Sequence, residues 1–158
     1  MEFDEYVVTY RGPLLRLAYL FTGDAHQAED VVQTALLKAF RSWRRVTRAD
    51  HPDAYVRRMV VNAYLDGRRR RASTELPTAT GELPAGAQDG HADSHADRDH
   101  MWAALAALPR SQRAVLVLRF YEALDDAGIA ELMGCGQSTV RSNAARGLAA
   151  LRKEWTHV

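Results

Sequence analysis

Histidine and aspartate, the side chains most often used to bind metal ions, gather between residues 91 and 100. The residues concerned are His91, Asp93, His95, Asp97, Asp99 and His100. They match no known ligand spacing such as His-Glu-x-x-His. They also lie in or beside a segment that we expect to be a flexible linker, which would not hold them in one geometry. We therefore expect neither a metal site nor a cofactor.

Nucleophilic catalysis is not indicated either. The one cysteine, Cys135, stands between two glycines and has no second cysteine at CxxC spacing, so an internal disulfide is also excluded. The glycines fall in helix breaks and polar segments, so no phosphate-binding loop is present. No local motif suggests a Ser/His/Asp group. The sequence predicts a protein that is not an enzyme.

The basic residues are concentrated in one block. Residues 38–71 contain 11 Lys or Arg and 3 Asp or Glu, although the net charge of the whole chain is only +1. The segment 73–96 has 4 acidic residues and no Lys or Arg. A block this uneven indicates a polyanionic partner such as a nucleic acid, and the alternative is a solvated helix face.

Apolar residues recur at helical spacing along the chain, and no segment shows the period of two that is typical of strands. The composition, 47% hydrophobic and 26% charged, is that of a globular protein. We expect an all-α fold with two small helical domains, residues 1–72 and 97–158. Residues 73–96 contain two prolines, three glycines and few large apolar side chains, which predicts a flexible linker.

Three helices are expected in the first domain. The first buries an apolar stripe that ends at Phe21, and Asp24 is placed to cap the second. The second carries an apolar face from Ala28 to Trp43, and a polar, basic loop follows over residues 44–52. Pro52 is suited to the start of the third helix.

Four short helices are expected in the second domain. The second of them carries the apolar residues Val115, Leu116, Leu118 and Phe120-Tyr121, and Asp125 or Asp126 caps the third. Gly128 falls inside that third helix, where a glycine costs about 1 kcal/mol relative to alanine.

Residues 126–145 fit a helix-turn-helix, of the winged-helix type without a wing. Ala130 is small enough for a close helix crossing, Gly134 allows a positive φ in the turn, and Val140 fills the core between the helices. The second helix of such a motif lies in the major groove and presents polar side chains to bases and phosphates. The candidates are Ser138, Thr139, Arg141, Ser142, Asn143 and Arg146. The alternative is a helical hairpin with a solvated outer face.

The order of these elements resembles the extracytoplasmic-function group of the sigma-70 family, over nearly all of residues 3–155. Residues 28–40, AEDVVQTALLKAF, resemble the segment with which that family docks on the clamp helices of RNA polymerase. The resemblance implies that Asp30 and Gln33 contact the core polymerase. The alternative, from the residues alone, is that they cap and solvate their helix.

Residues 53–71 resemble the helix with which this family reads the −10 promoter element. Arg58, Asn62 and Asp66 match its usual polar positions. Two positions depart from the family's pattern: Val61 stands where an arginine is common, and Tyr55 where a tryptophan is usual.

The loop 44–52 resembles the segment that captures a base flipped out of the non-template strand. Contacts with single-stranded DNA need basic side chains for the backbone and a pocket for the unstacked base. The candidates for the backbone contacts are Arg44, Arg45, Arg48 and His51. The resemblance also implies that the C-terminal domain reads the −35 element.

These expectations describe an RNA polymerase sigma factor, which directs promoter recognition and transcription initiation. Its partners would be the core RNA polymerase, promoter DNA (duplex at −35, partly single-stranded at −10) and, for control, an anti-sigma factor. The main alternative is a conventional helix-turn-helix regulator with an N-terminal sensor or dimerisation domain, but a sensor domain has no reason to carry a second basic surface. No apolar run approaches the roughly 18–20 residues that span a bilayer, and the N-terminus is acidic, so we expect no membrane contact and a cytoplasmic protein.

Overall fold

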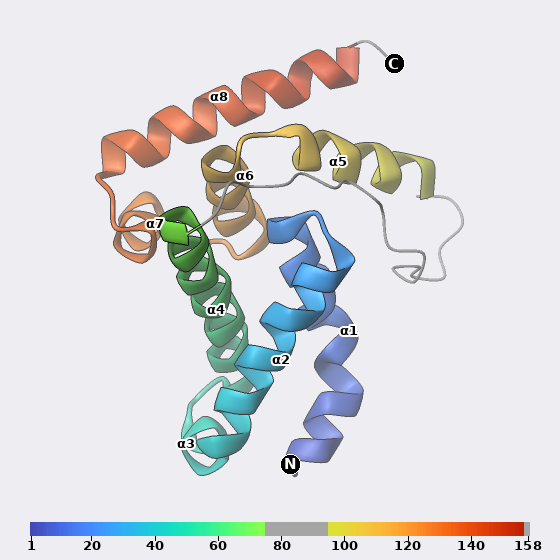
Figure 1. The fold of residues 1–158 in the computed structure, drawn as a ribbon, viewed down its shortest axis with the longest axis vertical. Helices are drawn as coiled ribbons and strands as arrows, with labels where there is room; N and C mark the ends of the chain where they lie inside the picture. Colours follow the sequence, from blue (N-terminus) through green and yellow to red (C-terminus); the bar gives the residue numbers. More distant parts are fainter. Residues whose placement is uncertain (75–94, 157–158) are drawn as a thin grey trace. The chain divides into compact units, whose positions relative to one another are not determined.

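The structure is a computed structural model that describes the backbone of residues 1–74 and 95–156 and the side chains of residues 1–68 and 100–154 (Figure 1). Within these ranges the chain is helical and has no strand, which confirms the expected all-α class. The chain divides into two units, Met1–Pro84 and Ala85–Val158. Most of the expected linker, residues 75–94, lies outside the described residues. Its two ends are helical, because helices continue through Thr74 and begin again at His95.

Three long helices and one short helix form the N-terminal unit. They are α1 (Phe3–Thr22), α2 (Ala25–Arg41), α3 (Trp43–Arg48) and α4 (Pro52–Thr74). Helices α1, α2 and α4 pack pairwise around one core (Figure 1). The largest fully buried side chains in this core include Leu14, Leu17 and Phe21 of α1 and Val32 of α2. These residues belong to the apolar stripes expected from the sequence.

The junction between α1 and α2 follows the expected chemistry. Gly23 ends α1 in the left-handed conformation, with φ of 67°, and donates its N–H to the carbonyl oxygen of Tyr19. The Asp24 carboxylate then accepts the backbone N–H of Gln27 at 3.1 Å and caps α2. These two hydrogen bonds end α1 and cap the start of α2. The short turn between them makes the two helices run antiparallel.

The basic segment 44–52 is not a simple loop, and in this respect the sequence-based expectation was wrong. Residues 43–48 form the helix α3. The physical reason is Val46, which is fully buried and anchors the short helix against the core. Trp43 is only partly buried, and its indole N–H donates to the carbonyl oxygen of Met1 at 3.1 Å.

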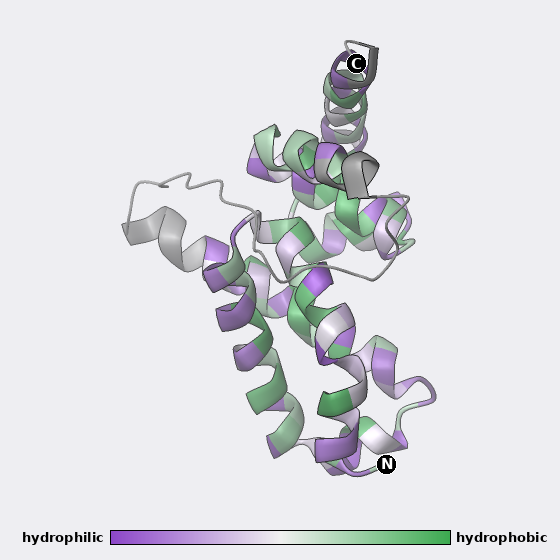
Figure 2. Ribbon diagram, turned by 90° about the vertical axis from the view of Figure 1, so that its right-hand side faces the viewer, coloured by the Kyte–Doolittle hydropathy of each residue, from purple (hydrophilic) through white to green (hydrophobic). Residues whose placement is uncertain are grey.

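The C-terminal unit also contains the four expected helices. They are α5 (His95–Ala107), α6 (Arg110–Leu116), which continues as the π-helical turn η2 (Val117–Tyr121), α7 (Asp126–Met133) and α8 (Gln137–Thr156). Helices α5, α6 and α7 each contact α8. Figure 2 shows hydrophobic and hydrophilic residues on different sides of the helices, as expected of amphipathic helices around a core. At 20 residues α8 is the longest described helix of this unit.

Two local features of this unit depend on the tertiary structure. Phe120 and Tyr121 are not buried: 63% and 44% of their surface is exposed. A π-helical turn contains more residues than an α-helical turn, so it changes the direction of the side chains that follow. Phe120 and Tyr121 therefore point away from the helix face on which Val115 and Leu118 are buried. Gly128 lies inside α7 as expected, as its third residue, and its N–H donates to the capping carboxylate of Asp125 at 2.8 Å.

Candidate nucleic-acid interfaces

The turn before α8 has the geometry of a helix-turn-helix. Gly134 adopts φ of 67° and ψ of 38°, and its N–H donates to the carbonyl oxygen of Ala130. Ala130 and Val140 are both buried between α7 and α8. These are the three positions that the sequence assigned to the crossing, the turn and the core plug. The turn therefore holds the first residues of α8 at a fixed angle to α7.

The predicted base-reading residues lie on the outer side of α8. Five of the six are exposed, and Asn143 is partly buried; the exposed ones are Ser138, Thr139, Arg141, Ser142 and Arg146. Val140, Ala144 and Gly147 lie on the opposite, buried side of the helix. The N-terminal half of α8 thus presents a polar, basic surface without an acidic residue.

Two acidic residues at the start of α7 have partners within the C-terminal unit. Asp126 forms an ion pair with Arg119 of the π-helical turn, and the Asp125 carboxylate caps α7. These two charges therefore help to hold α7 in place.

Helix α4 carries a second exposed polar stripe. Arg58, Asn62 and Asp66 are exposed at intervals of four residues, which places them on one side of the helix. Val60 on the other side is fully buried. Val61, the position where an arginine is common in the resembling family, is 1% exposed and packs in the core. This position therefore offers no positive charge to a ligand.

The basic residues of segment 44–52 are exposed. Arg44 and Arg48 are one helical turn apart on α3, and Arg45 lies beside them. His51, between α3 and α4, is exposed as well. The helix α3 therefore clusters three guanidinium groups more tightly than an extended loop would.

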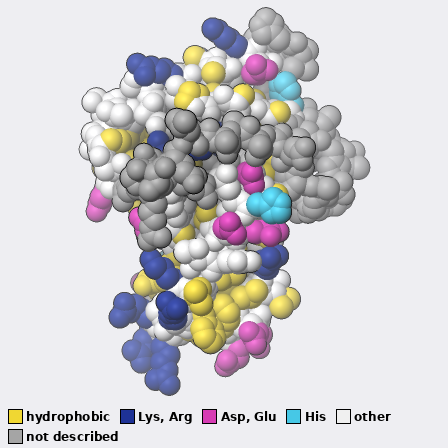
Figure 3. Space-filling model, in the orientation of Figure 1, with side chains coloured by type: hydrophobic (Ala, Val, Ile, Leu, Met, Phe, Trp, Pro, Cys, Tyr) yellow, Lys and Arg dark blue, Asp and Glu magenta, His cyan; other side chains and the backbone are white. Residues whose placement is uncertain are grey.

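The outer face of α2 combines polar and apolar side chains. Asp30 and Gln33 are exposed, as expected. Leu37 and Phe40 follow them at helical spacing and are 52% and 61% exposed, so the docking face is more apolar than Asp30 and Gln33 alone indicate. The signal for this was present in the sequence, because they belong to neither the buried stripe of α2 nor a polar run. Figure 3 shows hydrophobic side chains gathered over this part of the N-terminal unit, with Lys and Arg side chains beside them.

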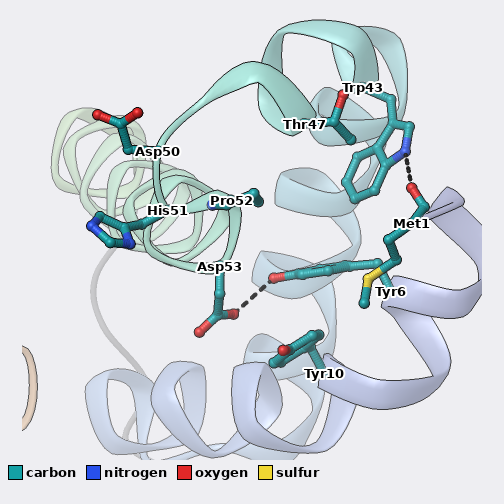
Figure 4. A pocket seen from close by; sticks show the side chains of 9 residues that line it. All are labelled: Met1, Tyr6, Tyr10, Trp43, Thr47, Asp50, His51, Pro52 and Asp53. Atoms are coloured by element: carbon teal, nitrogen blue, oxygen red, sulfur yellow. Dashed lines mark hydrogen bonds between the residues drawn. The ribbon is translucent and has the colours of Figure 1, made fainter.

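A cavity of about 400 Å³ opens where α1 begins, beside α3 and the start of α4 (Figure 4). The Tyr6 hydroxyl donates to the carboxylate of Asp53 at 3.0 Å across this space. Burial, together with the negative charge of Asp53 and the hydrogen bond to it, raises the pKa of Tyr6 well above its usual value. Of the residues predicted to bind DNA, His51 alone is among those lining the cavity.

The part of the chain that the structure describes shows neither a metal-binding cluster nor a membrane-spanning helix. No group of three or more His, Cys, Asp or Glu side chains is arranged to hold a metal ion among the described residues. Most side chains of the histidine- and aspartate-rich segment 91–100 lie outside them. No described helix is long and apolar enough to cross a membrane.

Two family models match the chain, one for each unit. The model for Sigma-70 region 2 matches residues 6–74, and the model for Sigma-70, region 4 matches residues 98–151. The chain is 36% identical over 154 residues to the RNA polymerase sigma-E factor of Streptomyces coelicolor, covering 98% of this chain and 86% of that protein. It is 32% identical over 142 residues to the ECF RNA polymerase sigma factor SigL of Mycobacterium tuberculosis, covering 88% and 80%.

The fold also has a counterpart among solved structures. The sigma factor RpoE from Bartonella quintana, solved in complex with the anti-sigma factor NepR, superposes with a TM-score of 0.64 at 19% identity. The match covers 98% of this chain and 96% of that one. At this level of identity the likeness concerns the fold.

The fold and the exposed faces define a helical DNA-binding protein with two units and a helix-turn-helix in the second. The chain belongs to the sigma-70 family, and it is an RNA polymerase sigma factor of the ECF type. The match of the Sigma-70 region 2 model to residues 6–74 also shows that the N-terminal unit is a sigma factor domain, which decides against the reading of this unit as a sensor or dimerisation domain.

Proposed function

We propose that this protein initiates transcription by binding and positioning alone, without chemistry of its own. Residues 1–72 dock on the core RNA polymerase and contact the −10 element, residues 97–158 contact the −35 element, and residues 73–96 join the two. The observation that carries this proposal is that α2 and α4 share one core yet expose their outer faces separately. One unit can therefore hold polymerase and DNA at the same time, in the cytoplasm where the polymerase acts.

The outer face of α2 is the proposed polymerase contact. Asp30 and Gln33 supply polar groups, and Leu37 and Phe40 supply apolar surface that is exposed in the free protein. Interfaces of this kind combine an apolar centre with a polar rim. An anti-sigma factor that covered the same face would compete with the polymerase, which makes it a natural further partner.

The −10 contact combines α4 with α3. The side chains of Arg44, Arg45 and Arg48 suit a single-stranded phosphate backbone, whose affinity is largely electrostatic. Arg58 and Asn62 on α4 can donate hydrogen bonds to exposed base edges. Because Val61 is buried, this helix provides less positive charge for strand separation than its relatives with arginine there.

The −35 contact uses the N-terminal half of α8. The exposed polar side chains Ser138, Arg141, Ser142 and Arg146 suit the hydrogen-bonding edges of the major groove. The fixed turn at Gly134 positions this half of the helix relative to the rest of the unit.

A reconstituted transcription assay tests the proposal. The purified chain, core polymerase and a genomic fragment library are combined, and the transcripts are sequenced. We expect defined start sites that appear only when the chain is added. Duplex binding by the chain alone, without such transcripts, would instead favour a conventional regulator.

The docking face is tested separately by charge reversal. Asp30→Lys should weaken binding to core polymerase while the helical content stays that of the parent. Asp66→Lys is the matched control, because it makes the same change on α4, away from the docking face. If Asp30→Lys binds core polymerase as well as the parent does, the docking assignment is wrong.

A further inference from the structure

The segment proposed to contact the −10 element, residues 44–52, has little structure of its own. Its helix α3 has six residues, fewer than an isolated helix needs to be stable in water, and the Ser42 side chain does not cap it. Val46 is the one buried residue of this helix. The position of the exposed basic side chains of the segment therefore depends on contacts with other helices at its two ends.

The first end of the segment packs on the start of α1. The ring of Trp43, the first residue of α3, lies 5.4 Å from the ring of Phe3 and 5.4 Å from the ring of Tyr6. Its indole N–H also donates to the carbonyl oxygen of Met1 at 3.1 Å. Aromatic rings at this separation attract each other, so α3 begins against α1.

The other end of the segment is bonded to the same helix. Asp53, the second residue of α4, accepts the hydroxyl hydrogen of Tyr6 at 3.0 Å. A carboxylate accepts stronger hydrogen bonds than a neutral oxygen does. Tyr6 is 1% exposed, so little water competes for its hydroxyl.

Tyr6 thus contacts both ends of the segment with one side chain. Its ring lies between those of Tyr10 and Trp43, with centroids 4.7 and 5.4 Å away, and its hydroxyl points to Asp53 (Figure 4). A ring packed between two others cannot turn freely, which fixes the direction of the hydroxyl. This side chain therefore sets the distance between the start of α3 and the start of α4.

Tyr6 is too deeply buried to contact DNA itself, so any effect on promoter recognition passes through segment 44–52. Hydrogen bonds to bases weaken steeply when their distance or angle changes. The attraction between guanidinium groups and phosphates falls off more slowly with distance. A displaced segment would therefore lose its preference between bases before it lost affinity for the strand.

We propose that Tyr6 is a positioning residue for the −10 contact. Its ring and its hydroxyl fix the two ends of segment 44–52, so that the segment meets the −10 element in one geometry. The inference rests on the proposed function, because it takes the −10 element to be the ligand of this segment.

The test is the sequence preference of full chain bound to core polymerase, measured with a promoter library randomised at −10. Tyr6→Phe keeps the ring, removes the hydroxyl and should reduce this preference about fivefold, the effect of one hydrogen bond. The affinity for core polymerase and the preference at −35 should stay parental, whereas a general weakening of the N-terminal unit would lower that affinity too. Tyr10→Phe is the matched control, because it removes a hydroxyl from the neighbouring ring of the same cavity, and it should keep the parental preference.

The partner of the hydroxyl provides a second set of variants. Asp53→Asn keeps an acceptor oxygen and should retain most of the −10 preference, whereas Asp53→Ala should lose it as Tyr6→Phe does. The double variant Tyr6→Phe/Asp53→Ala should be no worse than Asp53→Ala alone, because both changes remove the same hydrogen bond. Losses that add in the double variant would show that the two residues act separately.

The outcomes separate this inference from the proposed function. A parental −10 preference in Tyr6→Phe, or an equal loss in Tyr10→Phe, would overturn the inference and leave the proposed function in place. If the parent chain gives no defined start sites, the proposed function itself fails.

Hydrogen exchange of the free chain tests the positioning without the polymerase. Tyr6→Phe should speed the exchange of the α3 amides about fivefold, because α3 loses one of its attachments, and Tyr10→Phe should not. Parental exchange of α3 in Tyr6→Phe would show that Tyr6 does not position the segment.

Discussion

The two units of this protein pack in different ways. The N-terminal unit is filled by large side chains: Tyr6, Leu14, Leu17 and Phe21 are fully buried, and Phe21 stacks on Tyr64 at 4.8 Å. In the C-terminal unit, α8 approaches α6 so closely that a Cβ at Gly147 would lie 2.8 Å from Cδ1 of Leu116. Both cores contain large and small side chains, but the two units differ at their glycines, because Gly12 and Gly67 of the N-terminal unit meet nothing within 4 Å and Gly147 lies at a close helix contact.

This difference in packing agrees with the function proposed for each unit. The N-terminal unit must display several surfaces at once, and three long helices around one core can do so. The C-terminal unit must hold one helix, α8, at a fixed angle. Small residues at the contact allow that, but they leave little tolerance for added volume. We therefore expect substitutions at the contacts of α8 to be more damaging than similar ones in α4.

The largest effect is expected at Arg113, a buried residue of α6. Its guanidinium donates to the carbonyl oxygens of Ala106 and Leu108 at 3.3 and 3.1 Å, at the C-terminal end of α5. Arg113→Met leaves these carbonyls without their donor and should lower the free energy of unfolding by about 3 kcal/mol. Hydrogen exchange, which resolves the two units, measures this. Arg110→Met, on the same helix but not buried, should cost less than about 0.5 kcal/mol.

The next effect concerns DNA recognition by α8. Arg146→Ala should weaken recognition of the −35 element by about 1–3 kcal/mol if the side chain reads a base. Promoter libraries randomised at −35 or at −10 measure this, and only preferences at −35 should change. Lys153→Ala, farther along α8, provides the comparison. Unchanged promoter selection in both Arg141→Ala and Arg146→Ala would remove α8 as the reading element.

A matched pair of glycine substitutions compares the units directly. Gly147→Ala meets Leu116 and should lower the free energy of unfolding of the C-terminal unit by about 1–2 kcal/mol. Gly67→Ala, in α4, meets nothing within 4 Å and should raise that of the N-terminal unit by about 0.5–1 kcal/mol. Urea denaturation followed by hydrogen exchange separates the two results. Equal effects of both changes would contradict the contrast in packing.

The smallest effect is expected at Tyr6. Tyr6→Phe removes the hydrogen bond to Asp53 and should cost about 1 kcal/mol at neutral pH. The fold raises the pKa of Tyr6, so the unfolded chain releases this proton first, near pH 10, and stability falls as the pH rises beyond it. The free energy of unfolding should therefore fall less steeply above pH 10 in the variant. Parallel slopes for variant and parent would show that Tyr6 does not contribute.

Local signals in the sequence were sufficient for most helices and for both caps. Asp24 and Asp125 cap α2 and α7, and Gly134 forms the turn, because each of these depends on residues a few positions away. The helix α3 and the exposure of Phe120 could not be read in this way. The first depends on the burial of Val46 against other helices, and the second on a π-helical turn that changes the register of α6. The exposure of Leu37 and Phe40 was not predicted, because an apolar residue in a helical pattern favours burial in a core.

The sequence by itself determined the two-unit helical architecture, the helix-turn-helix and the family, since these depend on periodicity, caps and motif order. Only the tertiary structure decided which apolar side chains remain exposed and which charged ones meet. Tyr6 and Asp53 are 47 positions apart, and Tyr10 and Trp43 come from different helices, yet all four line one cavity. Contacts between distant segments depend on how the helices pack, and packing is set by the whole core and not by any local run of residues.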